Sequence, residues 1–363
     1  MRFINLDRQY VGQMQELNFA ATRVLASGRY ILGPEVEAFE SEFAKYCGVK
    51  HCIGVACGTD ALVLSLKVAG VGKGDQVIVP ANTYIATWFA VSRVGATPIP
   101  IEPGPDYCID VERARDRINC DVKAVIPVHL FGHPVDMSGV LELADDYGLI
   151  VVNDCAQAHG ARYDGKNVGA FRHLNAFSFY PTKTLGGFGD GGAVTTNDDG
   201  LADQVRRLRW EGQIEKYLSV EIGYNSLLDE LQAALLRVRL ANMRWTYDAR
   251  LAIASRYYNG LKELPINLPH VRRLVDHVYH QFVIRHSERD KLRKHLIEQG
   301  VPTLIHYPIP PHLQGAYRHL GYEKGDFPIT EEYADTMISL PICPAMTEEE
   351  IVLVVESIRS YFK

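Results

Sequence analysis

Lys183 is the residue of this sequence best suited to covalent chemistry, and it ends the segment Ser178-Phe-Tyr-Pro-Thr-Lys183. The apolar run at 177–180 predicts a buried strand, so the lysine is expected just after a strand end. Burial lowers the pKa of an amine, and a neutral amine forms a Schiff base with a carbonyl group. The segment therefore predicts a nucleophilic lysine, with a surface lysine in a turn as the alternative.

Asp154 ends another strand-like run, at 149–154. In open α/β sheets, ligands bind beyond the carboxyl ends of the strands. A carboxylate at that place serves as a metal ligand, as a ribose binder or as the partner of a cationic ring nitrogen. The alternative is a cap of the segment that follows.

Gly58-Thr59-Asp60 lies between a strand-like run at 51–56 and a helical pattern at 60–69. The backbone N–H groups of the first turn, the Thr59 hydroxyl and the helix dipole would together form an anion-binding cup. An ordinary helix N-cap is the alternative. This segment is the first candidate for binding a phosphate group.

A glycine-rich run follows the lysine, and its residues 187–192 match the GxGxxG pattern of dinucleotide-binding sites. That pattern requires a helix directly after it, whereas 193–196 is strand-like, so a dinucleotide site is rejected. The glycines are expected instead to let the backbone turn tightly around the lysine.

Taken together, a Schiff-base lysine, a carboxylate for a ring nitrogen and a phosphate cup describe a site for pyridoxal 5'-phosphate (PLP). No metal site is expected. The pairs His277-x-x-His280 and His129-x-x-x-His133 lack further ligands at usable spacing, and His280 is interpreted as a core histidine.

These residues need a scaffold of alternating strands and helices, which indicates an α/β fold with a mostly parallel sheet. Further strand-like runs occupy 76–80, 124–128 and 193–196. Helical patterns cover 35–46 and 201–209, and a long one covers 227–258. The regular alternation of strand-like and helical segments ends after Gly260, where a strand is expected at 279–285 and helices at 288–299 and 348–361. We therefore expect a large domain at 1–245 and a smaller α+β domain at 246–363.

The composition excludes several classes of protein. The 363 residues have a formal charge of −6, 47% are hydrophobic, and no run is long enough to cross a membrane. An acidic chain without a basic stripe does not indicate a nucleic-acid binder. The seven scattered cysteines and the absence of a signal-like N-terminus favour reduced thiols and a cytoplasmic location.

Ordered motifs along nearly the whole chain resemble those of the DegT/DnrJ/EryC1/StrS family of PLP-dependent sugar aminotransferases. These motifs are Ser27-Gly-Arg-Tyr-Ile-Leu-Gly-Pro34, Gly58-Thr-Asp-Ala-Leu62, Pro80-Ala-Asn-Thr-Tyr84, Pro127-Val-His-Leu-Phe-Gly132, Asp154-Cys-Ala-Gln-Ala-His-Gly160, Ser178-Phe-Tyr-Pro-Thr-Lys183, Gly223-Tyr-Asn-Ser226 and Ile305-His-Tyr-Pro308. The resemblance implies the PLP-dependent transferase fold type I, which is aspartate aminotransferase-like. Thr184, Leu227 and Cys155 depart from the residues common in the family.

The resemblance also implies a role for each matching residue. Lys183 would hold the cofactor and move the proton, and Asp154 would pair with the ring nitrogen. Tyr84 would stack on the ring, with core packing as the alternative, and Gln157 would contact the ring hydroxyl. The phosphate would be bound by Gly58, Thr59 and Ser178, and by Asn225 of the neighbouring subunit of a homodimer, where a turn residue is the alternative.

The implied reaction transfers an amino group from L-glutamate to a nucleotide-linked keto sugar. Glu215-Lys216-Tyr217, His277-Val-Tyr-His280 and His306-Tyr307 resemble the branch that acts at C-3 of dTDP-3-keto-6-deoxyhexoses. Such sugars enter lipopolysaccharide O-antigens, other glycans or natural products. The residues expected to contact the substrate are Tyr180, Tyr217, His306 and Tyr307 at the sugar, and Lys216 and Arg29 at the pyrophosphate.

Three alternatives remain at this point. The first is a transaminase that acts at C-4 of a UDP- or dTDP-linked keto sugar, or one that acts on a keto-inositol. The second is a sugar dehydratase, which the presence of Lys183 disfavours because that branch has histidine there. The third is a sensor that kept the fold, which would have no need of a Schiff-base lysine.

Overall fold

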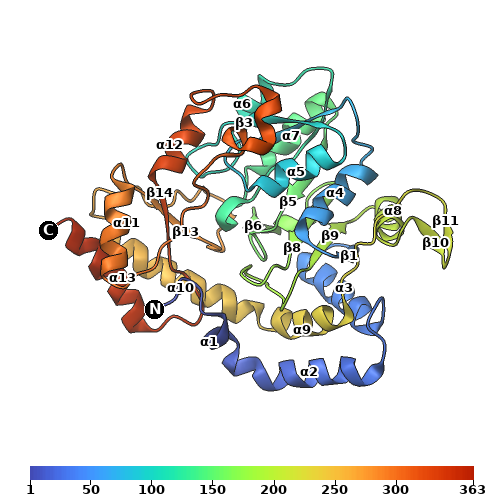
Figure 1. The fold of residues 1–363 in the computed structure, drawn as a ribbon, viewed down its shortest axis with the longest axis horizontal. Coiled ribbons are helices and arrows are strands. Elements are labelled where there is room, and N and C mark those ends of the chain that lie inside the picture. The colour runs from blue at the N-terminus through green and yellow to red at the C-terminus, as the bar shows by residue number, and fades with distance from the viewer.

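The computed structural model describes residues 1–363 and is organised around a seven-stranded sheet with the strand order β1-β9-β8-β5-β4-β2-β3 (Figure 1). Strand β9 is antiparallel to both of its neighbours, and the other strands run in one direction. The strands of this sheet are β1 (His51–Val55), β2 (Gln76–Pro80), β3 (Thr97–Ile101), β4 (Val122–Val125), β5 (Ile150–Asp154), β8 (Leu174–Ser178) and β9 (Gly192–Thr196). The predicted α/β class with a mostly parallel sheet is confirmed.

Strand β3 was not expected from the sequence, because it contains Pro98 and Pro100. Proline lacks the N–H group that a central strand must donate on one side or the other. The structure places β3 at the edge of the sheet, where it pairs only with β2. At an edge, one row of backbone groups needs no partner strand, so the two prolines are tolerated.

Helices cover both faces of the sheet (Figure 1). Val77 and Val79 of β2 belong to one buried cluster with residues of α4 and α5, whereas Ile78 between them packs with residues of α7. This alternation follows from the two-residue period of a strand. The helices of this part are α1 (Leu6–Tyr10), α2 (Met14–Ser27), α3 (Pro34–Cys47), α4 (Gly58–Val68), α5 (Ile85–Arg93), α6 (Val111–Arg115), α7 (Met137–Tyr147), α8 (Asp199–Arg209) and α9 (Glu230–Ala241).

The expectation of one long helix at 227–258 was wrong. Helix α9 ends at Ala241, and a second helix, α10 (Met243–Leu261), begins after Asn242. The Asn242 backbone leaves helical geometry, and its side-chain amide donates to the Val238 carbonyl at 2.9 Å. A local side-chain bond of this kind competes with the helical ladder, so the apolar pattern continues across the break while the helix does not.

The C-terminal part packs three helices, α10, α11 (Arg289–Glu298) and α13 (Glu348–Tyr361), around the antiparallel pair β13 (Phe282–Arg285) and β14 (Met337–Leu340). Its buried cluster includes Tyr257, Phe282 and Ile358. The boundary placed between residues 245 and 246 falls within α10 and stays a prediction.

One segment of the C-terminal part lies against the large sheet. Helix α12 (Pro328–Thr336) lies beside β3 and α6 in Figure 1. The Glu102 carboxylate accepts from Ile329 N at 2.8 Å and from Thr330 N at 2.9 Å, so it caps the start of this helix. Short strands complete the fold: β6 (Arg162–Tyr163), β7 (Lys166–Asn167), β10 (Gln213–Glu215), β11 (Leu218–Ser219) and β12 (Val275–Asp276).

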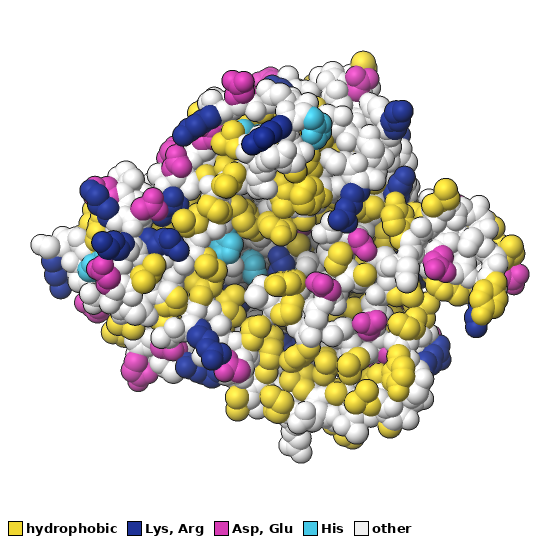
Figure 2. Space-filling view, viewed as in Figure 1, with side chains coloured by type: hydrophobic (Ala, Val, Ile, Leu, Met, Phe, Trp, Pro, Cys, Tyr) yellow, Lys and Arg dark blue, Asp and Glu magenta, His cyan; other side chains and the backbone are white.

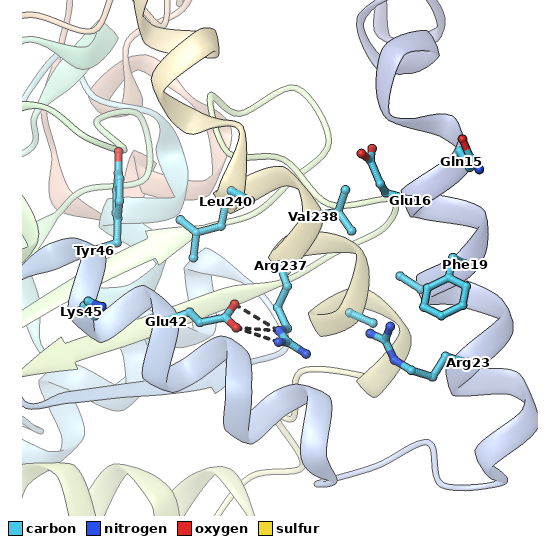
Figure 3. A pocket seen from close by; sticks show the side chains of 13 residues that line it. Gln15, Glu16, Phe19, Arg23, Glu42, Lys45, Tyr46, Arg237, Val238 and Leu240 are labelled. Atoms are coloured by element: carbon cyan, nitrogen blue, oxygen red, sulfur yellow. Dashed lines mark hydrogen bonds and ion pairs between the residues drawn. The ribbon is translucent and has the colours of Figure 1, made fainter.

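One cavity, of about 1000 Å³, is a groove between α2, α3 and α9 (Figure 3). Arg237 crosses it to pair with Glu42, with nitrogen–oxygen distances of 2.7 to 3.1 Å, and it also pairs with Glu35 at 2.6 Å. None of the predicted site residues lines this groove, so the candidate site lies elsewhere. Separately, none of the helices combines the length and the apolar character that a membrane crossing requires.

Candidate active site

The candidate site is a cavity of about 540 Å³ at the carboxyl ends of the parallel strands. Figure 2 shows a central hollow, in which histidine side chains and a basic side chain are visible. Strands β1, β2, β4, β5 and β8 all end at this edge of the sheet. Ten of the predicted residues line the cavity: Gly58, Thr59, Tyr84, Asp154, Gln157, Ser178, Tyr180, Lys183, His306 and Tyr307.

Lys183 lies on a tight loop that leaves the end of β8. The Lys183 N–H donates to the Tyr180 carbonyl at 2.8 Å, and Gly187 N–H donates to the Phe179 carbonyl at 2.8 Å, which closes the turn. A Cβ atom on Gly186 would collide with the Pro181 carbonyl oxygen, so only glycine permits this turn. The expectation that the glycines let the backbone turn around the lysine agrees with this geometry.

The first turn of α9 holds the far side of the same loop. The Gln232 side-chain oxygen accepts from Phe188 N–H at 2.8 Å. Cβ atoms on Gly187 and Gly189 would lie 3.0 and 2.9 Å from the Gln232 amide group. The glycine-rich run therefore lets this amide approach the backbone of the lysine loop closely.

Burial shifts the pKa values of Lys183 and Asp154 in opposite directions. Burial lowers the pKa of the Lys183 amine to about 8, although the Asp154 carboxylate opposes this change. Burial also raises the pKa of Asp154, which the Ala156 N–H, the Thr87 hydroxyl and Lys183 lower in turn. A substantial fraction of the lysine is therefore neutral near pH 8, as a nucleophile or base requires.

Asp154 accepts hydrogen bonds from two neutral donors, the Thr87 hydroxyl at 2.9 Å and Ala156 N–H at 3.1 Å. Its side chain is buried, and neither of these donors balances the charge of the carboxylate. A cationic ring nitrogen would supply that balance. Thr87 was not predicted as a site residue, because no motif in the sequence connects it with a carboxylate 67 residues away.

The segment predicted to bind a phosphate group lies at the start of α4. Cys57 caps this helix by accepting from Asp60 N–H at 3.5 Å. A Cβ atom on Gly58 would lie 2.5 Å from the Ser178 Cβ, so glycine lets the helix start approach the end of β8. Backbone N–H groups and the hydroxyls of Thr59 and Ser178 thus line the same end of the cavity, which suits a phosphate group.

Aromatic and amide side chains form the other walls. The Tyr84 and Tyr307 rings lie 5.2 Å apart, and the Tyr84 side chain is 52% exposed, so it offers a flat face to the cavity. The Gln157 side chain accepts from Phe131 N–H at 2.7 Å and donates to the Tyr307 hydroxyl at 2.9 Å. The residues present therefore fit PLP: a buried acid that forms no salt bridge, backbone and hydroxyl groups for a phosphate, a flat aromatic face and a buried lysine.

Four predicted residues lie outside this cavity. Lys216 and Tyr217 form the tip of the β10–β11 hairpin, which projects from the body of the chain (Figure 1), and Tyr217 is 88% exposed. Asn225 is exposed on the strand-like segment that follows. Arg29, in the loop between α2 and α3, donates to the Leu32 carbonyl at 2.6 Å. Their binding roles stay predictions.

The cavity also contains residues that were not predicted as site residues, including Thr87, Thr182, Asp190, His280 and Gln281. His280 was interpreted as an ordinary core histidine. The structure buries its side chain, yet leaves its Nδ1 atom without a hydrogen-bond partner and places the residue in the cavity wall. The sequence drew attention to the motif His277-Val-Tyr-His280 but did not place His280 in the site, because the segment before β13 brings this residue to the cavity from the C-terminal part.

Asp106, Cys108 and His133 form a buried cluster of the types that bind metals. However, the His133 Nε2 atom accepts from Arg272 N–H at 3.2 Å, so its proton resides on Nδ1, which faces the other two side chains. The Arg272 guanidinium also forms an ion pair with Asp106 at 2.5 Å. Asp106 is thus paired with a cation of the chain itself, and no metal site is proposed here.

Comparisons with known proteins agree with this geometry. Over 361 residues, the chain is 48% identical to a dTDP-3-amino-3,4,6-trideoxy-alpha-D-glucose transaminase of Streptomyces venezuelae, covering 99% of this chain and 95% of that protein. It is 46% identical over 360 residues to a dTDP-3-amino-3,6-dideoxy-alpha-D-galactopyranose transaminase of Aneurinibacillus thermoaerophilus, covering 99% of each.

The crystal structure of S. venezuelae DesV in complex with a ketimine intermediate has a TM-score of 0.98 to this chain, with 48% identity over 99% of this chain and 98% of that one. This likeness confirms the fold class expected from the sequence. The model of the DegT/DnrJ/EryC1/StrS aminotransferase family matches residues 13–359. The chain therefore belongs to the DegT/DnrJ/EryC1/StrS aminotransferase family.

Proposed function

We propose that this protein is a PLP-dependent aminotransferase that transfers an amino group from L-glutamate to C-3 of a dTDP-linked 3-keto-6-deoxyhexose. The observation that carries the proposal is the buried pair Lys183 and Asp154 in one cavity with a phosphate cup. Two relatives at 48% and 46% identity are named for 3-amino sugars, which favours C-3 over the C-4 alternative.

PLP, when bound, supplies an aromatic ring that accepts the electron pair released at the carbon bearing the amine. Lys183 takes a proton from that carbon and returns it to the other reacting carbon, because its amine has a pKa of about 8. Asp154 keeps the ring nitrogen protonated. Gly58, Thr59 and Ser178 would hold the phosphate, and Tyr84, whose ring lies 5.2 Å from the Tyr307 ring in the cavity wall, would stack on the cofactor ring.

The enzyme works as a homodimer in this proposal, with Asn225 reaching the phosphate of the neighbouring subunit and Lys216 reaching the substrate's pyrophosphate. The support is physical. Lys183 is the only lysine or arginine that lines the cavity, so the cavity of a single chain offers no second cation for a pyrophosphate. The 213–222 hairpin exposes large apolar side chains, including Ile222 at 96%, as expected of a surface that a second copy covers.

Mixing two inactive variants tests the shared site. Lys183→Ala and Asn225→Asp lie on different chains of each proposed site, so a mixed dimer retains one intact site. After subunit exchange, we expect activity to return to about a quarter of the wild-type level, because half of the dimers are mixed. The assay is glutamate-dependent amination of the keto sugar.

The matched control for this mixture is Lys183→Ala with Asp154→Asn. Both residues belong to the same chain of the site, so no mixed dimer has an intact site and no activity should return. If Lys183→Ala and Asn225→Asp also failed to restore activity although tagged subunits co-purified, the placement of Asn225 would be wrong.

The choice of carbon is tested with the amine-loaded enzyme and a panel of dTDP- and UDP-linked 3-keto and 4-keto sugars. We expect the dTDP-linked 3-keto sugar to react at least about 10²-fold faster than a 4-keto sugar, because the reacting carbon must meet the Lys183 amine. The measurement is the rate of the half-reaction, followed by the visible absorbance of the cofactor. A faster reaction with the 4-keto sugar would favour the alternative.

We also propose that the enzyme is cytoplasmic and that it takes part in deoxyamino-sugar biosynthesis. All seven cysteines are unpaired in the structure, and reduced thiols are typical of cytoplasmic enzymes. A deoxyamino sugar linked to dTDP is a precursor for a glycosyl transfer step, which fits the synthesis of lipopolysaccharide, another glycan or a natural product.

A further inference from the structure

His280 lies in the wall of the candidate active site with its backbone firmly held. It precedes β13, and its side chain is 5% exposed. Gln281 N–H donates to the Phe131 carbonyl at 3.2 Å, and the buried Arg250 guanidinium donates to the His280 carbonyl at 3.3 Å. The imidazole is therefore presented to the cavity by a fixed backbone.

The imidazole ring of His280 forms no hydrogen bond with the protein, so its N–H donor is unused. Nδ1 of His280 is buried and has no partner, and no protein atom bonds to Nε2. Two histidines nearby differ in this respect. His277 Nδ1 accepts from Tyr279 N–H at 3.1 Å, and His306 Nδ1 lies 2.8 Å from the Ser339 hydroxyl.

The tautomer of His280 follows from this arrangement. A buried N–H group without an acceptor is rarer than a buried acceptor without a donor. The proton is therefore placed on Nε2, the ring nitrogen that is not fully enclosed. His280 thus offers an N–H group to the cavity, and no protein atom accepts it.

The protonation of the two histidines in this wall indicates which chemical groups of a ligand they can bind. Burial holds the pKa of His280 well below its ordinary value, and the positive groups Lys183 and Arg250 and the rings of His306 and His159 lower it further. Burial likewise lowers the pKa of His306 to about 4. Both imidazoles are neutral at pH 7. A carboxylate is usually bound by a fixed positive charge, whereas neutral N–H groups suit carbonyl and hydroxyl oxygens.

We propose that His280 is a substrate-binding residue whose Nε2–H donates a hydrogen bond to a carbonyl or hydroxyl oxygen of the hexose, beside His306 and close to the carbon that Lys183 serves. The proposal rests on the proposed function and deepens it, because it assigns the contact to the sugar and not to the amino donor. A site that hydrogen-bonds a substrate oxygen is specific for it, since an unpaired buried donor is costly.

The two half-reactions of the holoenzyme test this assignment separately. His280→Phe keeps the size of the ring and removes the donor. We expect its kcat/KM for the dTDP-linked 3-keto sugar to fall about 10- to 100-fold, with the glutamate half-reaction changed by less than about twofold. His280→Gln places an amide N–H near the position of Nε2 and should recover most of the loss.

A binding measurement gives a readout other than activity. Calorimetric titration of the apoenzyme with the dTDP-linked 3-amino sugar should show weaker binding to His280→Phe by a similar factor. The matched control is His277→Phe, a buried histidine of the same loop that does not line this cavity. It should keep wild-type binding and both half-reactions, and thermal unfolding of each variant verifies that it is folded.

The proposal is overturned if His280→Phe leaves the sugar half-reaction unchanged, or if both half-reactions fall equally. A loss confined to the glutamate half-reaction also overturns it and assigns the residue to the amino donor. These results differ from a failure of the proposed function, in which the wild-type enzyme itself would aminate none of the keto sugars.

Discussion

Replacing Lys183 with alanine is expected to abolish transamination, with a loss of at least about 10³-fold in kcat. Lys183 is the only lysine that lines the cavity, and burial has already lowered the pKa of its amine to about 8. No other side chain there combines nucleophilicity with this position. The visible absorbance that reports the lysine-bound cofactor should disappear from the purified variant, and steady-state kinetics should show no turnover.

The pH dependence of cofactor capture provides a second measurement for Lys183. Only the neutral amine attacks a carbonyl group, and the amine becomes neutral as the pH rises through its pKa. The wild-type apoenzyme should therefore capture PLP faster as the pH rises across about 8 and reach a plateau above that value. Lys123→Ala is a suitable control, because the Lys123 amine donates to the Gly70 carbonyl outside the cavity. Normal turnover by Lys183→Ala would show that the assignment is wrong.

Replacing Asp154 with asparagine should leave the fold and part of the cofactor binding intact but reduce kcat about 10²-fold. The substitution keeps the shape of the side chain and removes its negative charge. A neutral amide cannot hold a proton on the ring nitrogen, so the ring becomes a poor acceptor of electrons. The cofactor content, measured by absorbance, separates this effect from a loss of binding.

Asp154→Asn should also shift the titration of Lys183. The Asp154 carboxylate raises the pKa of the lysine against the effect of burial, so its removal should move the midpoint of cofactor capture to lower pH. Thr87→Val is the matched comparison, because it removes the 2.9 Å hydrogen bond to Asp154 but keeps the charge. It should cost less activity than Asp154→Asn. Equal losses for both variants, or unchanged kinetics for Asp154→Asn, would contradict the role of the charge.

Much of the site was predictable because its residues follow strand ends. Asp154 is the last residue of its strand, Gly58 and Lys183 follow shortly after theirs, and parallel strands end at the same edge of a sheet. Local sequence therefore predicted both the residue types and their convergence. The glycines after the lysine were predictable for the same reason, since a tight turn at Gly186 is a local requirement.

Other features depended on contacts between distant segments. Thr87 meets Asp154 across 67 residues of sequence, and His280 reaches the cavity from the C-terminal part. Strand β3, with two prolines, is stable because it lies at the sheet edge. The break at Asn242 divides a continuous apolar pattern into two helices.

By itself, the sequence determined the α/β class and predicted a nucleophilic lysine, an acidic partner and a phosphate cup, because each of these predictions depends on a short segment. Only the tertiary structure decided which side chains lack partners. It showed that Asp154 is buried and forms no salt bridge, that the cavity of one chain contains a single lysine, and that the His280 ring has no hydrogen-bond partner. Burial and hydrogen bonding depend on what other segments bring to the same place, and this cannot be derived from the residues of one segment.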